Sequence, residues 1–242
     1  MTQLRDLLAR DGFAIVDDCR APIDELLAAV RSPDASGVRS HGRSVFAVRN
    51  LLAIRAVAEF ARSDAVRALV EPVLGPSAVA VRGILFDKTP GANWKVPWHQ
   101  DLSIAVKQRV EVDGFGPWSL KAGVTHVQPP VAVLDQMCTL RLHLDACGED
   151  NGPLKVVPSS HRFGVLSVER LTAVVTTGPI VSCCVPQGGA VLMQPLLAHA
   201  SSAATRPGHR RVIHIEFSGA ALPPPLSWAC AIGKSRSLVT AS

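Results

Sequence analysis

The chain has 242 residues, of which 48% are hydrophobic and 19% are charged. This composition excludes an intrinsically disordered protein, and the length allows one sizeable hydrophobic core. With 25 basic and 20 acidic side chains the formal net charge is +5, a balance that favours acidic partners. No run of lysine and arginine is interleaved with aromatic residues, and tyrosine is absent. We therefore expect no nucleic-acid partner.

Signals for a membrane or an oxidising compartment are weak. The opening MTQLRDLLARDG carries charges where a signal peptide has an apolar run. The six cysteines show no CxxC motif and no zinc-type spacing, so reduced thiols in the cytoplasm are expected. Residues 171–198 lack charge over a length that can span a bilayer, but Pro179, Pro186 and Pro195 divide the segment. We expect two buried strands around the PQGG turn and no membrane span.

The first third of the chain is predicted to be mainly helical. Apolar residues at helical spacing indicate helices in residues 2–10 and 21–32, with the strand GFAIVDD between them. Residues 31–44 are rich in serine, glycine and arginine and predict a loop. The segment SDAVRALVEPVLG has an N-cap signal at Ser63 or Asp64 and ends near Gly75, which predicts another helix.

From Ala78 onward short strands replace the helical period. The segments AVAVRGILFDK, MCTLRLHLD, LKVVP and RVIHIEFSG are typical of strands. Residues 106–130 contain several glycines and prolines and predict a long loop, the expected lid and seat of specificity. Helices followed by short strands predict an α+β fold with a β-sandwich or jelly-roll core. We expect a single domain, residues 1–242, with its core at about 78–220 behind a helical part at about 1–75.

The segment VPWHQDLSIAV places His99 and Asp101 two residues apart, where a strand is expected to begin. Residues i and i+2 of a strand project from the same face, so both side chains can reach one metal ion. His199 is a third candidate ligand. Two histidines and a carboxylate on one face of an iron ion are typical of non-haem Fe(II) oxygenases. Arg210, eleven residues after His199, offers a planar cation for the far carboxylate of a chelating 2-oxo acid.

The spacing of the residues leaves two assignments open, the pair of metal ligands and the arginine that binds the carboxylate. His143 and Asp145 form a second HxD pattern on a convincing strand, and spacing alone does not decide between the two pairs. Arg211 is a register alternative to Arg210. Strand alternation favours Arg210, which shares its parity with the polar His214, whereas Arg211 shares it with apolar residues.

Three motifs in order, WHQD, EDNGPLKVVPSSH and HAS with an arginine eleven residues after its histidine, resemble the phytanoyl-CoA dioxygenase family of Fe(II)/2-oxoglutarate oxygenases. The similarity runs from about Gly12 to Trp228. It implies a double-stranded β-helix (jelly-roll, cupin-like) core. It also implies an oxidoreductase that uses O2 to hydroxylate an unactivated C–H bond of a small-molecule metabolite, with conversion of 2-oxoglutarate to succinate and CO2.

The resemblance also implies roles for particular residues. It assigns Fe(II) to His99, Asp101 and His199 rather than to the second HxD, and it assigns 2-oxoglutarate to Arg210 and Ser201. A cationic residue near the co-substrate or substrate is expected at Arg49, so that Arg210, Ser201 and Arg49 are the expected co-substrate contacts. Candidate substrate contacts are Arg141, Trp118, His126 and Ile84. The alternatives are desaturation or cyclisation at the same site, a cupin-like metal enzyme without 2-oxoglutarate, or a binding module.

Overall fold

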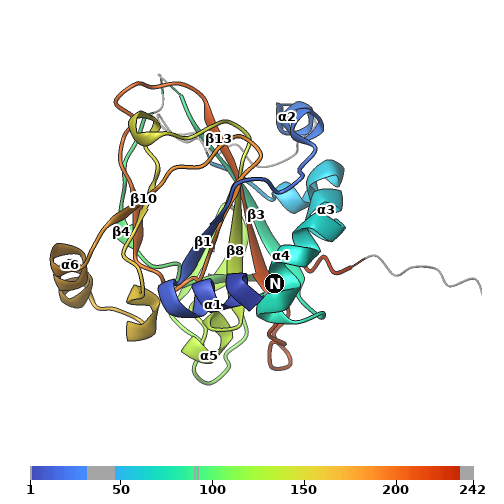
Figure 1. The fold of residues 1–242 in the computed structure, drawn as a ribbon. Coiled ribbons are helices and arrows are strands. Elements are labelled where there is room, and N and C mark those ends of the chain that lie inside the picture. Colours follow the sequence, from blue (N-terminus) through green and yellow to red (C-terminus); the bar gives the residue numbers. More distant parts are fainter. Residues whose placement is uncertain (1, 32–46, 90, 92, 235–242) are drawn as a thin grey trace, which may run out of the picture.

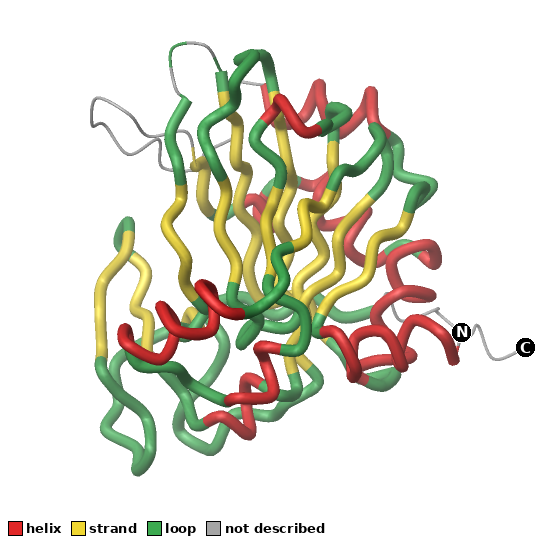
Figure 2. Tube along the Cα trace, turned by 60° about the vertical axis from the view of Figure 1, so that its left-hand side comes forward, coloured by secondary structure: helices red, strands yellow, loops and turns green. Residues whose placement is uncertain are grey.

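The computed structural model describes residues 2–31, 47–89, 91 and 93–234. Apart from Arg31, the loop expected at 31–44 lies outside the described residues. Two antiparallel sheets face each other across the interior and form a double-stranded β-helix within an α+β fold, as predicted (Figures 1 and 2).

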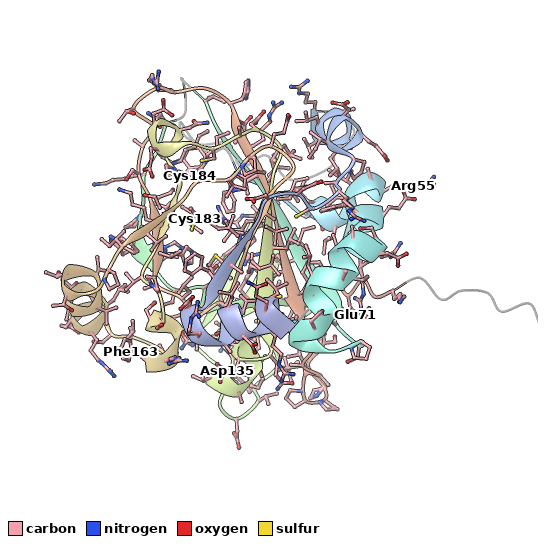
Figure 3. The ribbon with its side chains drawn as sticks, viewed as in Figure 1. Arg55, Glu71, Asp135, Phe163, Cys183 and Cys184 are labelled. Carbon is pink, nitrogen blue, oxygen red and sulfur yellow. The ribbon has the colours of Figure 1, made fainter. Side chains whose placement is uncertain are left out.

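The larger sheet has six strands and carries most of the chain's long-range pairing. Its order is β1 (Phe13–Val16), β11 (Ala190–Met193), β8 (Met137–His143), β13 (Arg210–Ser218), β3 (Val79–Lys88) and β2 (Ala47–Arg49). The smaller sheet has the order β10 (Val181–Cys183), β9 (Leu154–Val156), β12 (His199–Ser201) and β4 (Val96–His99). At the end of β10, Cys183 is buried and Cys184 is exposed, and all six cysteines are free thiols (Figure 3).

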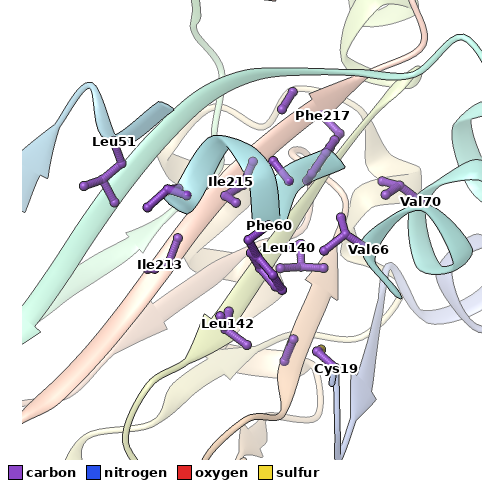
Figure 4. Packing of buried hydrophobic residues seen from close by; sticks show 14 of the residues in the cluster. Cys19, Leu51, Phe60, Val66, Val70, Leu140, Leu142, Ile213, Ile215 and Phe217 are labelled. Atoms are coloured by element: carbon purple, nitrogen blue, oxygen red, sulfur yellow. The ribbon is translucent and has the colours of Figure 1, made fainter. Parts of the chain in front are cut away.

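Four helices cover the outer face of the larger sheet (Figure 1). They are α1 (Thr2–Asp11), α2 (Ile23–Arg31), α3 (Arg55–Arg62) and α4 (Asp64–Leu74), with the 3-10 turn η1 (Leu51–Ala53) before α3. The predicted cap of α4 is present, because the Ser63 hydroxyl accepts a hydrogen bond from the Val66 N–H at 3.4 Å. Phe60 and Val66 pack against alternate residues of β8 and β13, including Leu140 and Ile215, in the main hydrophobic core (Figure 4).

This packing decides what faces the interior between the sheets. Leu140, Leu142, Ile213 and Ile215 point to the helices. The residues between them on the same strands therefore point inward, since successive strand side chains alternate between faces. The inward-facing polar residues of these strands include Arg141, His143, Arg210, His214 and Glu216, and all of these are buried.

The prediction of a long loop at residues 106–130 is wrong in part, because this segment contains a β-hairpin. β6 (Trp118–Lys121) pairs with β7 (Val124–Val127), and β7 pairs with β5 (Ile104–Val106) in a third sheet. Ala122 and Gly123 form the two-residue turn with φ of 51° and 78°. Turns with positive φ at both residues match the twist of the flanking strands. A short helix, α5 (Val131–Leu134), follows.

The uncharged segment 171–198 also departs from expectation. Its first residues belong to α6 (Val168–Thr177), whose cap is the Ser167 hydroxyl. The two strands expected around the PQGG turn are β10 and β11. No helix in the described part of the chain has the length and apolar character needed to cross a membrane. The remaining 3-10 turns are η2 (Glu149–Asn151) and η3 (Ser160–Phe163).

Candidate active site

Three side chains of the smaller sheet converge on one point. His99 ends β4 and His199 begins β12, directly opposite in register, and their ring centroids are 4.1 Å apart. The Asp101 carboxylate oxygens lie 3.9 Å from His99 Nε2 and 3.7 Å from His199 Nε2. One ligand atom from each residue lies within 4.8 Å of the others, and no other group of three such ligands is found in the described residues.

The backbone brings His99 and Asp101 together in a way that differs from the prediction. The strand does not begin there. It ends at His99, and Asp101 follows in a segment outside the strand. The Asp101 N–H donates to the Pro195 carbonyl at 2.9 Å, which ties this segment to the chain that leads into β12. The two ligands therefore meet through the irregular segment that follows β4 and not through strand periodicity.

Main-chain carbonyls orient both imidazoles. His99 Nδ1 lies 2.8 Å from the Pro97 carbonyl, and His199 Nδ1 lies 2.9 Å from the Leu197 carbonyl. A carbonyl only accepts, so each Nδ1 carries the proton and each Nε2 lone pair faces Asp101. Burial is the main cause that lowers the pKa of His199, to about 4, which leaves that ring neutral at neutral pH.

The charge of the third ligand also suits a metal ion. Burial raises the pKa of Asp101, but the nearby His199, His214 and His99 outweigh it and the pKa is lowered. Its Oδ2 is buried and has no hydrogen-bond partner in the part of the chain that the structure describes. Two nitrogen lone pairs and an unpartnered carboxylate oxygen converge here, so the donor set fits a divalent cation such as Fe(II).

A cavity of about 130 Å³ adjoins this centre, and we call it the arginine cavity. It is lined by the three candidate ligands together with Phe86, Trp94, Arg141, Ser201, Arg210 and His214. Arg210, the first residue of β13, is 3% exposed, and burial lowers its pKa. Its Nη1 donates to the Gly152 carbonyl, while its Nε has no partner among the described residues. The cavity thus offers a guanidinium opposite the metal ligands.

Arg141 lies in this cavity and not beside the other candidate substrate contacts. Its Nη1 is 2.9 Å from His214 Nδ1, and its guanidinium carbon is 5.5 Å from the centre of the Phe86 ring. A contact of this kind with an aromatic face stabilises a buried cation. Among the other candidates, Ile84 is buried on the same strand as Phe86 but does not line the cavities described here.

The second HxD pattern does not form a metal site with His199. The Asp145 carboxylate binds the Arg211 guanidinium at 2.5 and 2.8 Å and also accepts from the Arg211 N–H at 2.8 Å. His143 is 2% exposed, and neither of its ring nitrogens has a hydrogen-bond partner within the described ranges. The ion pair with Asp145 also explains why the Arg211 side chain does not line the arginine cavity.

Two further cavities are distinct from the arginine cavity. One of about 340 Å³, the metal-side cavity, is lined by His99, Asp101, Trp118, Arg82 and Lys121 among others. The second, of about 230 Å³, we call the basic cavity. Its polar lining comes from Arg49, Asn50, Arg82, Lys121 and His126. Trp118 and His126, predicted as substrate contacts, therefore line adjacent cavities, and Arg49 lies in the basic cavity rather than with Arg210.

Comparison with known proteins identifies the family. The profile of the phytanoyl-CoA dioxygenase (PhyH) family matches residues 8–212. The chain belongs to this family. Family membership and the three-residue centre support the cofactors predicted from the motifs, Fe(II) and 2-oxoglutarate. The comparison with curated proteins finds no significant match.

Solved structures with the fold of the phytanoyl-CoA dioxygenase family are numerous. AviO1 from Streptomyces viridochromogenes Tue57 superposes with a TM-score of 0.64 at 28% identity, over 92% of this chain and 96% of that one. EctD from S. alaskensis, in complex with 2-oxoglutarate and 5-hydroxyectoine, gives 0.67 at 18% identity over 90% and 76%. The epimerase SnoN from nogalamycin biosynthesis gives 0.66 at 18% identity over 90% and 82%.

Lys88 is a residue of this site that the sequence reasoning missed. It is the last residue of β3, pairs with Arg210 across the sheet, and is 1% exposed. Its Nζ donates to the Ser201 hydroxyl at 3.2 Å and to the Ser202 carbonyl. Burial, and then the charge of Arg210, lower the pKa of Lys88 to about 8. Strand alternation from Arg82 through Phe86 would have placed Lys88 on the inner face next to Arg210.

Proposed function

We propose that the chain is an Fe(II)- and 2-oxoglutarate-dependent dioxygenase that hydroxylates an unactivated C–H bond of a small-molecule metabolite. The observation that carries this proposal is one juxtaposition. His99, Asp101 and His199 present their ligand atoms within 4.8 Å of one another, at the wall of a cavity that also holds Arg210. Neither Arg210 nor Lys88 forms an ion pair with a carboxylate of the described residues.

The bound metal, with O2, supplies the oxidation of the substrate that accompanies conversion of 2-oxoglutarate to succinate and CO2. The chain's own residues bind and orient the co-substrate. Arg210, which lines the cavity beside the metal ligands, binds its far carboxylate, and a charge-assisted hydrogen bond of this kind contributes about 1.5–3 kcal/mol, or about one to two decades of affinity. Lys88 donates to Ser201 Oγ, which leaves the Ser201 proton free for the same carboxylate.

The interior also orders and shields the reacting groups. Carbonyls of Pro97 and Leu197 hold the two imidazoles. The carboxylate of Asp101 completes the ligand set, and an intact carboxylate favours hydroxylation over halogenation, which needs that position for a halide. Trp118, in the wall of the metal-side cavity, excludes water from the face where the substrate C–H bond would lie.

Succinate release tests the proposal. Purified protein with Fe(II), 2-oxoglutarate and air is compared with Asp101→Ala, Asp145→Ala and Arg210→Ala, without added substrate. We expect slow uncoupled release from the wild type, a loss of at least about a hundredfold in Asp101→Ala, and retention in Asp145→Ala. Arg210→Ala should regain turnover at higher 2-oxoglutarate concentration.

The Asp145→Ala variant is the matched control, because it removes a carboxylate from the other HxD pattern. It also breaks the ion pair with Arg211, so its Tm is measured beside its activity. If the wild type releases no succinate, 2-oxoglutarate is titrated anaerobically in the presence of Fe(II). Failure to bind would overturn the proposed function.

A further inference from the structure

The basic cavity gathers cations from separate strands around one space. Arg49 comes from β2, Arg82 from β3 and Lys121 from β6, and all three line the same cavity of about 230 Å³. Each side chain is partly buried. Positive charges placed together in a partly desolvated cavity repel one another, so the arrangement is unfavourable unless an anion joins them.

Among the described residues, only one of these three cations forms an ion pair with a carboxylate. Glu216 Oε1 lies 2.9 Å from Arg82 Nη1. The hydrogen bond recorded for Lys121 Nζ goes to the neutral Ser103 hydroxyl at 2.8 Å, and the buried Nη1 of Arg49 has no partner in the described part of the chain. Burial is the largest cause that lowers the pKa of both Arg49 and Lys121, and their mutual repulsion with Arg82 acts in the same direction. Glu216 acts in the opposite direction on both cations, and Asp101 does so on Lys121, but neither Arg49 nor Lys121 has a carboxylate within ion-pair distance among the described residues.

His126 adds a polar group of a different kind. It is 2% exposed, and its Nδ1 lies 2.9 Å from the Val124 carbonyl, so Nδ1 carries the proton and Nε2 is an acceptor. That Nε2 is buried with no hydrogen-bond partner among the residues described. Burial lowers the pKa of His126 to about 4, which keeps the ring neutral. An unpartnered acceptor beside two cations that lack an ion-pair partner indicates a ligand that has both an anionic group and a hydroxyl or amine donor.

The basic cavity shares part of its wall with the cavity at the metal ligands. Arg82 and Lys121 line both this cavity and the metal-side cavity, which His99 and Asp101 also line. An anionic group bound at Arg49 and Lys121 would therefore lie next to the cavity that adjoins the metal centre. Apolar residues, including Leu52, Val81 and Ala105, form the rest of the wall of the basic cavity and suit a carbon skeleton.

We propose that the basic cavity is an anion subsite, in which Arg49, Arg82 and Lys121 bind a carboxylate or phosphate group of the substrate and so select anionic metabolites. This inference rests on the proposed function. Arg82 is partly neutralised by Glu216, so Arg49 and Lys121 carry most of the selectivity. His126 Nε2 accepts a hydrogen bond from a donor group next to the anion.

Calorimetric titration of the full chain tests the subsite. The probes are inorganic phosphate, benzoate and its uncharged counterpart benzamide, at constant ionic strength set with chloride. We expect phosphate and benzoate to bind and benzamide to bind at least tenfold more weakly. Arg49→Gln and Lys121→Gln should each weaken anion binding by about tenfold to a hundredfold.

Arg55→Gln is the matched control for loss of one positive charge. Arg55 lies on α3, outside the larger sheet, where it pairs with Glu59 at 2.7 Å (Figure 3), so anion affinity should not change. Arg49→Gln and Lys121→Gln remove cations that lack an ion-pair partner among the described residues, and their Tm should be equal to or above that of the wild type. Absence of anion binding in the wild type, equal binding of benzamide, or a loss in Arg210→Gln alone would overturn the subsite.

A second titration separates this inference from the proposed function. Anaerobic binding of 2-oxoglutarate is measured with Fe(II) in the same variants, and we expect Arg49→Gln and Lys121→Gln to keep wild-type affinity. A loss of 2-oxoglutarate affinity without a loss of benzoate affinity would assign Arg49 and Lys121 to the co-substrate and overturn the subsite. If the wild type binds benzoate at Arg49 and Lys121 but fails to bind 2-oxoglutarate, only the proposed function fails.

Discussion

The arginine cavity and the basic cavity are both cationic, but they are built differently. Arg210 lines the arginine cavity and Lys88 contacts its lining residue Ser201; the two cations are 3% and 1% exposed and donate to main-chain carbonyls and a hydroxyl. In the basic cavity, Arg49 and Lys121 are only partly buried, and one of the three cations has a carboxylate partner. The first set of cations is held in place before any ligand arrives, whereas the second has more freedom to adjust.

This difference matches the two ligands proposed for them. A co-substrate of fixed structure benefits from preorganised donors, because no side chain has to be ordered when it binds. A substrate site on loops and short strands varies more easily between related enzymes. The contrast teaches that charge alone does not distinguish a co-substrate site from a substrate site, while the way each cation is held does.

Arg210→Gln is expected to cause the largest difference in ligand affinity between the two cavities. It removes the guanidinium from the arginine cavity, so 2-oxoglutarate affinity should fall by about tenfold to a hundredfold, while benzoate affinity at the basic cavity stays the same. Arg211→Gln is the matched control, since Arg211 is bound to Asp145. Anaerobic titration with Fe(II) gives both affinities, and an equal loss in the two variants would contradict the assignment.

The next largest effect concerns the stability of the fold in acid. It compares two buried histidines, His143 and His126. Burial lowers the pKa of His143 to about 3. The unfolded chain takes up a proton at this residue below its ordinary pKa of about 6.5 and the folded chain does not, so stability falls as pH decreases from 6.5 to about 3. At pH 5 this loss is on the order of 1–2 kcal/mol. His143→Leu should reduce the dependence of unfolding free energy on pH.

His126 provides the comparison for that experiment. His143 has no hydrogen-bond partner within the described residues, so His143→Leu costs little at pH 7, whereas His126→Leu also removes the hydrogen bond to Val124. Urea unfolding at pH 7 and pH 5 measures both variants. An unchanged pH dependence in His143→Leu would show that this residue is not the source of acid sensitivity.

The arginine cavity could be predicted from sequence to a greater extent than the basic cavity. His99, Asp101 and His199 occur in motifs that resemble a known family, and strand alternation was enough to distinguish Arg210 from Arg211. Lys88 obeys the same alternation and could have been found. The irregular segment that brings Asp101 to His99 is held by a hydrogen bond to Pro195, almost a hundred residues away, and no local pattern predicts it.

The basic cavity depends on pairing that the sequence does not reveal. Arg49, Arg82 and Lys121 lie in three strands that belong to two different sheets. Lys121 reaches the cavity because of the β6–β7 hairpin, in a segment for which the sequence predicted a loop. The hairpin had a local signal, since Ala122-Gly123 separates two short runs containing β-branched and aromatic residues. No local sequence signal predicts that the three cations line one cavity.

The smallest expected effect tests whether the two cavities are electrically separate. A buried row of side chains runs between them. Arg141 Nη1 lies 2.9 Å from His214 Nδ1, His214 Nε2 lies 3.4 Å from Glu216 Oε1, and that oxygen lies 2.9 Å from Arg82 Nη1. Glu216→Gln keeps the size of the side chain and removes its charge, so Arg82 loses its carboxylate partner.

We expect Glu216→Gln to raise benzoate affinity at the basic cavity severalfold, an effect on the order of 1 kcal/mol or less, because Arg82 then attracts the ligand without competition. Glu71→Gln is the matched control. Glu71 pairs with Arg67 at 2.7 Å on α4, on the outer side of the larger sheet (Figure 3), and its loss should leave benzoate affinity unchanged. If Glu216→Gln changes 2-oxoglutarate affinity by the same factor as benzoate affinity, the row couples both cavities, and the substrate's anion and the co-substrate then bind to a single electrostatic unit.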